Sequence, residues 1–354
     1  MTLPEARTAA RWAITLALGA AGGALALWIG APLPWLLGGL AATGLAASVK
    51  LRILGAPVAF PMRLRSLFIP VIGVLIGAAM TPEVLRAAPG WWPGLVSVPL
   101  FVVAAHGVNY LWLRHVGGLS KPTAFFAGMP GGLIESLEQG EKHGADLRAL
   151  TVLQFARIAL TVTVTPLVFS ALEGRALGSA AGAALARGTM EFSDAAVMTA
   201  AGVAGYFGGR WLRLPAAQIL GPILASGAVH ALGWTDAAPP GWLVALAQLV
   251  IGVTLGLRFV GVAPRALGRY FALSAGSVAL MLGIGAGFAL ALSAAGLAPF
   301  KVMILSYAPG GVIEMGLIAV SLNASPIFVT AHHLVRIVAT VLAAAVGWRR
   351  IGAL

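Results

Sequence analysis

Met129-Pro130-Gly131-Gly132-Leu133-Ile134-Glu135 is repeated, 179 residues later, as Ala308-Pro309-Gly310-Gly311-Val312-Ile313-Glu314. Proline and glycine interrupt helices, and a glutamate is costly in hydrocarbon. One copy could arise by chance, whereas two copies in the same register and in apolar surroundings indicate a duplicated membrane protein. Broken backbone at membrane depth persists only where protein buries it or where it lines a water-filled cavity. The two motifs are therefore the first candidates for a functional site.

The composition is that of an integral membrane protein. Of 354 residues, 59% are hydrophobic and 10% are charged, and the mean hydropathy is +0.94. A soluble domain carries about 25% charged residues. The net charge of +12 comes from lysines and arginines in short loops between apolar runs, which is typical of orientation signals and not of a nucleic-acid-binding surface. Because the chain has no cysteine, disulfides, thiolate metal sites and cysteine nucleophiles are excluded.

The duplication extends beyond the two motifs. Val71-Ile72-Gly73-Val74 aligns with Val250-Ile251-Gly252-Val253 at the same offset of 179, and Arg157-Ile158 aligns with Arg336-Ile337. Nearer the start of each half the offset is 183, which a difference in loop length explains. We expect a first membrane repeat over residues 1–172, a linker over 173–192 and a second membrane repeat over 193–354. The first apolar run belongs to the repeat, so we expect it to be retained and not cleaved as a signal peptide.

Each half contains six apolar runs. We expect helices over 10–29, 34–49, 66–82, 91–113, 122–141 and 147–171, and again over 193–209, 214–232, 241–259, 270–295, 302–321 and 326–348. Most runs approach the roughly 20 residues that a span needs. The fifth run of each half is divided by its Pro-Gly-Gly, which predicts either a re-entrant hairpin or a helix broken at mid-membrane.

Charge distribution favours inverted repeats. If the fifth run of each half enters and leaves on one side, each half crosses five times, and 17 lysines and arginines lie inside against 4 outside, with both termini cytoplasmic. The loop over 50–65 holds four basic residues, whereas its repeat mate over 233–240 holds only Asp236 as a charged residue. Opposite charge in equivalent loops indicates opposite orientation. The predicted fold is an all-α polytopic membrane protein of two inverted repeats.

Interrupted helices at equivalent positions of inverted repeats predict a transporter with a site near the midplane. A half-helix that starts at Gly131-Gly132 or Gly310-Gly311 presents free N–H groups and a partial positive charge, which suit an anion such as a carboxylate. The alternative interpretation is a tight packing turn. Arg157 and Arg336 lie inside apolar runs, where an arginine costs about 2.5–3.5 kcal/mol unless a glutamate, freed carbonyls or an anionic solute compensates it.

The neighbours of these groups complete the candidate site. Glu135 and Glu314 either cap their half-helices, pair with the arginines, or carry a proton or bind a cation. Gln154 and His333 each precede an arginine by three residues and share its helix face. The predicted solute-binding residues are Pro130, Gly131, Gly132, Glu135, Gln154, Arg157, Pro309, Gly310, Gly311, Glu314, His333 and Arg336.

The sequence predicts no metal site and no cofactor. The adjacent His332 and His333 point about 100° apart on a helix, so they do not readily chelate one ion. No other histidine motif and no cysteine completes a ligand set.

The two copies of Pro-Gly-Gly-[Leu/Val]-Ile-Glu, each followed about 22 residues later by Arg-Ile, resemble the membrane AbrB family over nearly the whole chain. These are duplicated bacterial inner-membrane proteins, unrelated to the DNA-binding regulators of the same name and often labelled as ammonia monooxygenases. The family is similar to inverted-repeat secondary transporters that have re-entrant hairpins, form dimers and move in an elevator-like manner. The resemblance thus implies a multi-pass protein of the bacterial cytoplasmic membrane and a homodimer.

Three functions follow as hypotheses. The first is a secondary active transporter, not an enzyme, of a small anionic solute, driven by a proton or a sodium ion. The second is a membrane regulator or sensor that binds a ligand without moving it. The third, a membrane monooxygenase, is disfavoured because copper or di-iron chemistry needs clustered ligands that the chain lacks.

Overall fold

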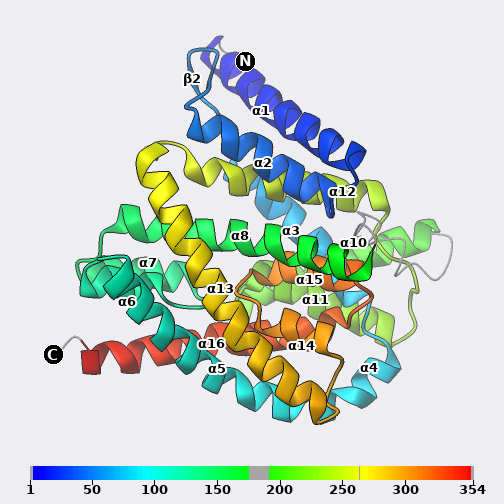
Figure 1. Ribbon diagram of the computed structural model, residues 1–354. Helices are drawn as coiled ribbons and strands as arrows, with labels where there is room; N and C mark the ends of the chain where they lie inside the picture. The colour runs from blue at the N-terminus through cyan, green and yellow to red at the C-terminus, as the bar shows by residue number, and fades with distance from the viewer. Residues whose placement is uncertain (1–2, 175–190, 263, 352–354) are drawn as a thin grey trace. The chain divides into compact units, whose positions relative to one another are not determined.

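A computed structural model describes residues 3–174, 191–262 and 264–351, and it is almost entirely helical (Figure 1). Every apolar run is helical, which confirms the expected elements. The first half contains α1 (Leu3–Trp28), α2 (Pro34–Ser48), α3 (Met62–Gly77), α5 (Trp92–Leu111), α6 (Lys121–Ala127), α7 (Leu133–Lys142) and α8 (Leu147–Glu173). The second contains α10 (Phe192–Trp211), α11 (Ala217–Ala231), α12 (Gly241–Gly256), α13 (Pro264–Ala294), α14 (Phe300–Tyr307), α15 (Val312–Ser321) and α16 (Pro326–Ile351). Most of the linker expected over 173–192 lies outside the described residues.

Several short elements were not expected from the sequence. The loop after α2 forms a two-stranded hairpin of β1 (Arg52–Ile53) and β2 (Ala56–Pro57). A short helix α4 (Pro82–Ala87) and a 3-10 turn (Ala88–Trp91) precede α5, and a π-helical turn (Trp112–Val116) follows it. These elements are too short to show as apolar periodicity, so the hydrophobic pattern could not reveal them.

Six helices of the described part are long and apolar enough to cross a membrane. They are Glu5–Trp28, Pro82–Val116, Leu147–Glu173, Gly241–Phe259, Arg265–Ala294 and Pro326–Arg350. The helices α2, α3 and α11 have 15 or 16 residues and are shorter than the roughly 20 residues of an ordinary span. The chain is thus an all-α membrane protein.

The chain divides into two compact units, and each unit draws on both repeats. Unit 1 comprises Met1–Arg86, Thr163–Pro264 and Gly316–Ile327, and unit 2 comprises Ala87–Val162, Arg265–Met315 and Phe328–Leu354. The first three helices of each repeat therefore belong to unit 1. The interrupted fifth runs up to Met315, and the arginine-bearing parts of α8 and α16, belong to unit 2.

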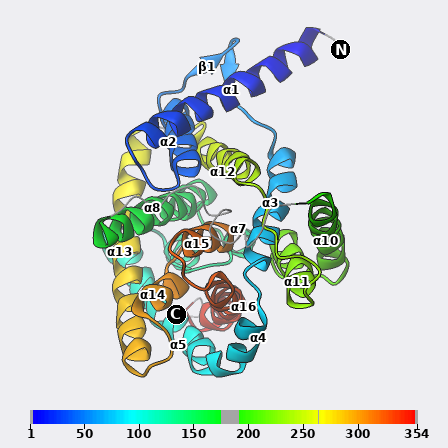
Figure 2. The same cartoon turned by 90° about the vertical axis from the view of Figure 1, so that its right-hand side faces the viewer.

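Glycines bring the first two helices of each repeat into backbone contact within unit 1. A Cβ atom on Gly38 of α2 would lie 2.2 Å from the carbonyl oxygen of Gly22 in α1, and one on Gly221 of α11 would lie 1.9 Å from that of Gly205 in α10. The two pairs are repeat mates at the offset of 183. Only glycine permits such an approach. Figure 2 shows α1 beside α2 and α10 beside α11.

The second helix of each repeat packs against the third helix of the other repeat. The helix α2 packs against α12, and α11 packs against α3. The Thr43 hydroxyl in α2 donates to the carbonyl of Val253 at 3.2 Å, and the Ser226 hydroxyl in α11 donates to that of Val74 at 2.9 Å. Because Thr43 and Ser226 are repeat mates, as are Val74 and Val253, the two repeats contact each other reciprocally, as in a two-fold interface.

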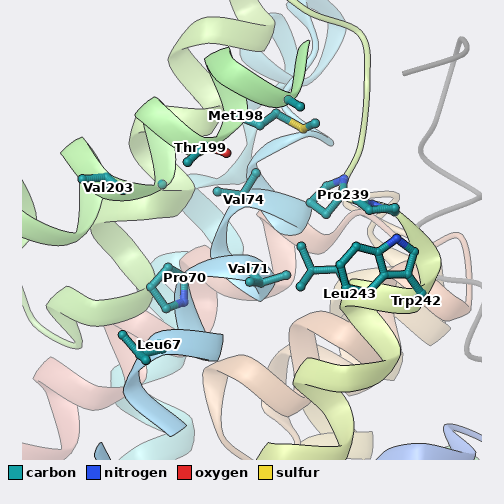
Figure 3. A pocket seen from close by; sticks show the side chains of 13 residues that line it. Leu67, Pro70, Val71, Val74, Met198, Thr199, Val203, Pro239, Trp242 and Leu243 are labelled. Atoms are coloured by element: carbon teal, nitrogen blue, oxygen red, sulfur yellow. The ribbon is translucent and has the colours of Figure 1, made fainter. Parts of the chain in front are cut away.

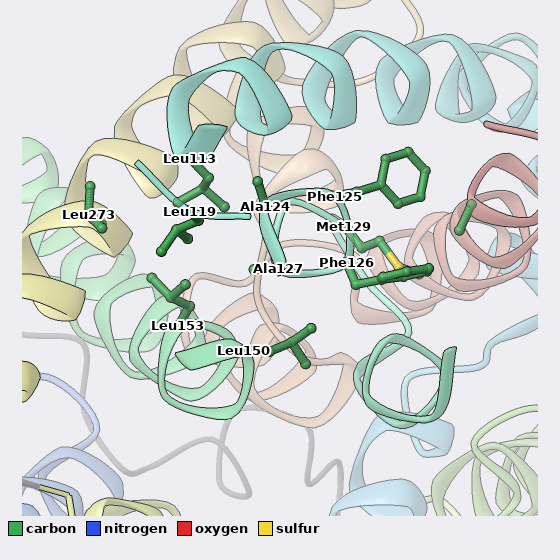
Figure 4. Close-up of a cluster of buried hydrophobic side chains, with 11 residues drawn as sticks. Leu113, Leu119, Ala124, Phe125, Phe126, Ala127, Met129, Leu150, Leu153 and Leu273 are labelled. Atoms are coloured by element: carbon green, nitrogen blue, oxygen red, sulfur yellow. The ribbon is translucent and has the colours of Figure 1, made fainter. Parts of the chain in front are cut away.

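Unit 2 is built around a cluster of aromatic and aliphatic side chains, many of them from α6 and α8 (Figure 4). Phe125 and Phe126 of α6 pack edge to face, with ring centroids 5.2 Å apart. The ring N–H of Trp112 donates to the carbonyl of Leu273 at 3.0 Å, and the Ser274 hydroxyl donates to that of Leu153 at 3.2 Å. These bonds attach α13 of the second repeat to helices of the first.

We predict that Gly205→Ala destabilises the protein by about 1–3 kcal/mol through overpacking. The added methyl would lie 2.6 Å from backbone atoms of Gly221 and Pro222. Gly208→Ala on the same helix is the matched control, since a Cβ there meets nothing within 4 Å among the described residues. Thermal unfolding of the purified variants in detergent measures both. An equal effect of the two substitutions would contradict the close α10–α11 contact.

Candidate functional site

The first Pro-Gly-Gly turns the chain back on itself. The hydroxyl of Thr123, early in α6, accepts from the N–H of Asp146, which lies just beyond α7, at 2.8 Å. The Ser136 hydroxyl in α7 donates to the carbonyl of Phe126 near the end of α6 at 2.7 Å. The two helices therefore run antiparallel as a hairpin.

Both motifs are followed at once by a helix, as the sequence predicts. The helix α7 begins at Leu133, and its N-cap residue Gly132 has φ 63°, a left-handed conformation that favours glycine. The helix α15 begins at Val312, directly after the second motif. The first turns of both helices thus lie beside the interruption, where their N–H groups have no partners within the helix.

The interruption leaves the last carbonyls of α6 without partners in the helix, and buried side chains donate hydrogen bonds to them. His106 and Asn109 of α5 donate to the carbonyls of Phe125 and Gly128, at 2.9 and 3.1 Å. The Gln154 amide donates to the carbonyl of Phe126 at 2.9 Å. A helix end buried in protein needs such partners.

Arg157 and Arg336, at equivalent positions of the two repeats, also donate hydrogen bonds to freed carbonyls. Arg157 is 4% exposed and Arg336 is 2% exposed. Arg157 donates to the carbonyl of Met129, and Arg336 donates to that of Ala308. Met129 and Ala308 each precede the proline of their motif. Of the three compensating groups that the sequence allowed for each arginine, freed carbonyls are present for both.

His333 adds to this arrangement in the second repeat. Its Nε2–H donates to the carbonyl of Leu305 at 2.9 Å, and its Nδ1 accepts from Arg336 at 3.1 Å. Arg336 also donates to the carbonyl of Gly310 at 2.5 Å. Since a carbonyl only accepts and a guanidinium only donates, these two contacts fit an imidazole that carries a single proton, on Nε2. Gln154 and His333 are repeat mates, and they bind the carbonyls of repeat mates Phe126 and Leu305.

The two glutamates fold back over their own motifs. A Cβ atom on Gly311 would lie 2.1 Å from Oε2 of Glu314, and one on Gly132 would lie 3.3 Å from Oε2 of Glu135. Glu314 is 3% exposed, whereas Glu135 is half-buried. Both carboxylates therefore lie at the positive ends of their helices, which matches the capping interpretation.

The first motif lies against the arginine of the second repeat. A Cβ atom on Gly131 would be 3.7 Å from Nε of Arg336 and 3.9 Å from Cα of Ile337. All twelve predicted solute-binding residues belong to unit 2. Unit 2 therefore gathers the predicted residues of both repeats, and the Gly131 contact shows that the two sets meet.

Both arginines retain an unused donor. The Nε atoms of Arg157 and Arg336 are buried and have no hydrogen-bond partner among the described residues. An unpartnered buried donor on a charged group is unfavourable, and an anion is the group that satisfies it best. No group of three or more histidine, cysteine, aspartate or glutamate side chains in the described ranges is arranged to hold a metal ion.

Sequence reasoning missed several polar residues of this arrangement: His106 and Asn109 of α5, Ser136, and the pair Thr161 and Thr340. Ser136 accepts from the Gln154 amide at 3.0 Å, but its repeat mate is Met315, so the repeat gave no signal for it. Thr161 and Thr340 lie one turn beyond the arginines and are repeat mates at the offset of 179. Their matching positions were the signal that could have identified them.

A separate apolar pocket lies in unit 1, between α3, α10 and α12 (Figure 3). Its volume is about 410 Å³, and Val71, Val74, Met198 and Leu243 are among the residues that line it. None of the twelve predicted residues does so. Its walls offer no charged group to an anion, so it is distinct from the candidate site.

Similarity to known proteins runs over nearly the whole chain. A family model described as "Transition state regulatory protein AbrB" matches residues 35–352. The chain is 25% identical over 314 residues to an Escherichia coli (strain K12) protein named "Putative regulator AbrB", covering 86% of this chain and 90% of that protein. It is 26% identical over 350 residues to "Uncharacterized protein YhjN" of Bacillus subtilis (strain 168), covering 91% and 88%. No solved structure matches the chain.

We predict that the cysteine pair Gly131→Cys with Ile337→Cys forms an intramolecular disulfide, because the two backbones approach within reach of one. The chain has no native cysteine, so loss of maleimide labelling after mild oxidation measures the bond directly. The control pair replaces Ile337 with Val338, whose side chain is 46% exposed and points about 100° away on the same helix. Equal oxidation of both pairs would contradict the contact between the first motif and α16.

Proposed function

This chain belongs to the membrane AbrB family, and we propose that it is a secondary active transporter of a small organic anion, a carboxylate or an amino acid. The observation that carries the proposal is the pair of buried arginines, each bound to an interrupted helix and each with an unpartnered Nε–H. The proposal involves no chemical conversion of the solute, so in it the protein acts as a carrier and not as an enzyme. Its partners are the solute, a coupling ion and the lipid bilayer.

An anion suits this site on electrostatic grounds. The terminal nitrogens of both guanidinium groups bind neutral carbonyls, which do not cancel the two positive charges. A carboxylate would accept from Nε–H and bring a negative charge next to the guanidinium group at the same time. The helix starts of α7 and α15 add partial positive charge beside the same motifs.

The glutamates are the proposed coupling groups. Glu314 is almost fully buried at the start of α15, and Glu135 is its repeat mate. With the site empty, the two carboxylates balance the two arginines. When an anionic solute enters, protonation of a glutamate or arrival of a sodium ion restores the balance, which couples solute movement to the ion gradient.

The proposed architecture is that of inverted repeats with re-entrant hairpins in the bacterial cytoplasmic membrane, with both termini inside. Its support is the charge count of the loops, the antiparallel hairpin of α6 and α7, and the reciprocal contacts of α2 with α12 and α3 with α11. Because unit 2 contains all of the site residues, we propose that unit 2 moves with the solute while unit 1 anchors the protein, as in an elevator transporter. We also propose that the protein is a homodimer.

A membrane regulator or sensor is the second candidate function. The name "Putative regulator AbrB" of the Escherichia coli relative favours it. A sensor would use the same anion site without moving the ligand. Binding alone therefore does not distinguish the two functions, whereas accumulation against a gradient does.

Uptake into proteoliposomes tests the proposed function. Carboxylates and amino acids are first screened for thermal stabilisation of the purified protein, and those that bind are then supplied to proteoliposomes under an imposed proton or sodium gradient. We expect accumulation above equilibrium, and we expect Arg336→Gln to reduce it at least tenfold, since a hydrogen bond to a charged group is worth about 1.5–3 kcal/mol. Arg86→Gln, at an exposed arginine, is the matched control.

Two outcomes would contradict the proposal. Binding without accumulation under either gradient would support the sensor. Unchanged uptake in both Arg157→Gln and Arg336→Gln would exclude the arginines from the site. Because Arg336 also binds two carbonyls, Arg336→Lys serves as a second variant that keeps the charge if Arg336→Gln fails to fold.

The inverted topology has its own test. We predict that cysteines introduced as Arg52→Cys and Asp236→Cys are labelled from opposite sides of the membrane by an impermeant maleimide, the first from the cytoplasm and the second from outside. The two positions lie in loops that are equivalent in the two repeats. Labelling from the same side would indicate parallel repeats.

A further inference from the structure

Two threonines next to the arginines bind none of the described carbonyls that the interruptions free. Thr161 follows Arg157 by four residues in α8, and Thr340 follows Arg336 by four in α16. Residues four apart share a helix face, so each threonine lies over its arginine. Both are 0% exposed.

Their hydroxyls lack the hydrogen bond to a backbone carbonyl that several other buried hydroxyls of this chain make. The hydroxyls of Thr254 and Ser306 donate to the carbonyl four residues earlier, each at 2.9 Å. The hydroxyls of Thr161 and Thr340 have no partner within the described ranges. Burying a hydroxyl without a partner is unfavourable, and it occurs here at matched positions of both repeats, beside two equally unpartnered Nε atoms.

The unpartnered atoms of the second repeat converge on one point. A Cβ atom on Gly131 would lie 3.4 Å from Oγ1 of Thr340 and 3.7 Å from Nε of Arg336. A ligand oxygen near this point could accept from both the Oγ1–H and the Nε–H groups. Two donors on one oxygen, one of them charged, are the chemistry of a carboxylate site.

We propose that Arg157 with Thr161 and Arg336 with Thr340 form two carboxylate subsites, and that the solute is a small dicarboxylate. The inference rests on the proposed function, whose solute it specifies. Each repeat supplies one positive charge and one hydroxyl, so a solute with a carboxylate at each end uses both repeats. Such a dianion also carries one negative charge for each of the two buried arginines. A monocarboxylate would leave one pair of donors unused.

Binding to the purified protein, measured by thermal-shift titration, tests the inference. The probes are malonate, succinate and glutarate, with butyrate as the four-carbon monocarboxylate control for succinate. We expect at least one dicarboxylate to bind at least tenfold more tightly than butyrate. Thr161→Val and Thr340→Val should each weaken that binding roughly tenfold, and serine at either position should restore it. Thr330→Val, at another buried unpartnered hydroxyl of α16, should leave binding unchanged.

A second variant acts on the ligand position without removing a donor. In Gly131→Ala the methyl group would occupy the convergence point at ordinary contact distances, and the φ of Gly131 is outside the left-handed region. We expect a folded protein that no longer binds the dicarboxylate. Gly287→Ala, where a Cβ meets no described atom within 4 Å, is the control.

The outcomes separate this inference from the proposed function. Gradient-driven uptake of a solute other than a dicarboxylate, or binding of dicarboxylates that ignores both threonine substitutions, overturns the dicarboxylate site and leaves transport standing. Threonine-dependent binding of a dicarboxylate without uptake supports the site and overturns transport. If none of the three dicarboxylates binds, the inference is wrong.

Discussion

The interruption of a helix inside apolar protein creates backbone groups that must find partners, and this requirement organises unit 2. Pro-Gly-Gly ends α6 and α14 after only 7 and 8 residues, and the residues that carry their last carbonyls are buried. Side chains from neighbouring helices bind these carbonyls instead. A buried arginine is well suited to this task, because its five donors serve several acceptors at once.

The same solution has an electrostatic consequence. Neutral carbonyls satisfy hydrogen-bond donors but do not cancel charge, so unit 2 contains two buried guanidinium groups whose positive charges these carbonyls leave in place. The repeats differ in which other side chains bind the freed carbonyls. In the first repeat, His106, Asn109 and Gln154 do so together with Arg157, whereas in the second repeat His333 does so together with Arg336. The unused Nε and threonine hydroxyls, by contrast, are the same in both. The donors that the two repeats have in common are thus the ones that would bind the ligand in our proposal.

In the described part of unit 1 the two repeats contact each other without buried charged groups of this kind. Its helices meet through glycines and through hydroxyl-to-carbonyl bonds that are exchanged between the repeats, Thr43 with Val253 and Ser226 with Val74. Close backbone contact leaves little freedom for side chains to rearrange, which suits a rigid anchor. The contrast with the polar, charged core of unit 2 is consistent with the division of labour that we propose for the two units.

The sequence alone was sufficient for whatever depends on local pattern and on the repeat. Hydrophobic periodicity located every long helix, Pro-Gly-Gly located both interruptions, and the offset of 179 matched Arg157 with Arg336 and Gln154 with His333. Only the tertiary structure decided which groups these side chains bind, because Arg157 and the Met129 carbonyl are 28 residues apart and their approach depends on how α8 packs. For the same reason, the fold-back of α7, the division of each repeat between two units and the convergence of Arg336 and Thr340 on Gly131 could not be read from spacing. Contacts between distant segments are set by packing in three dimensions, which a periodic pattern does not encode.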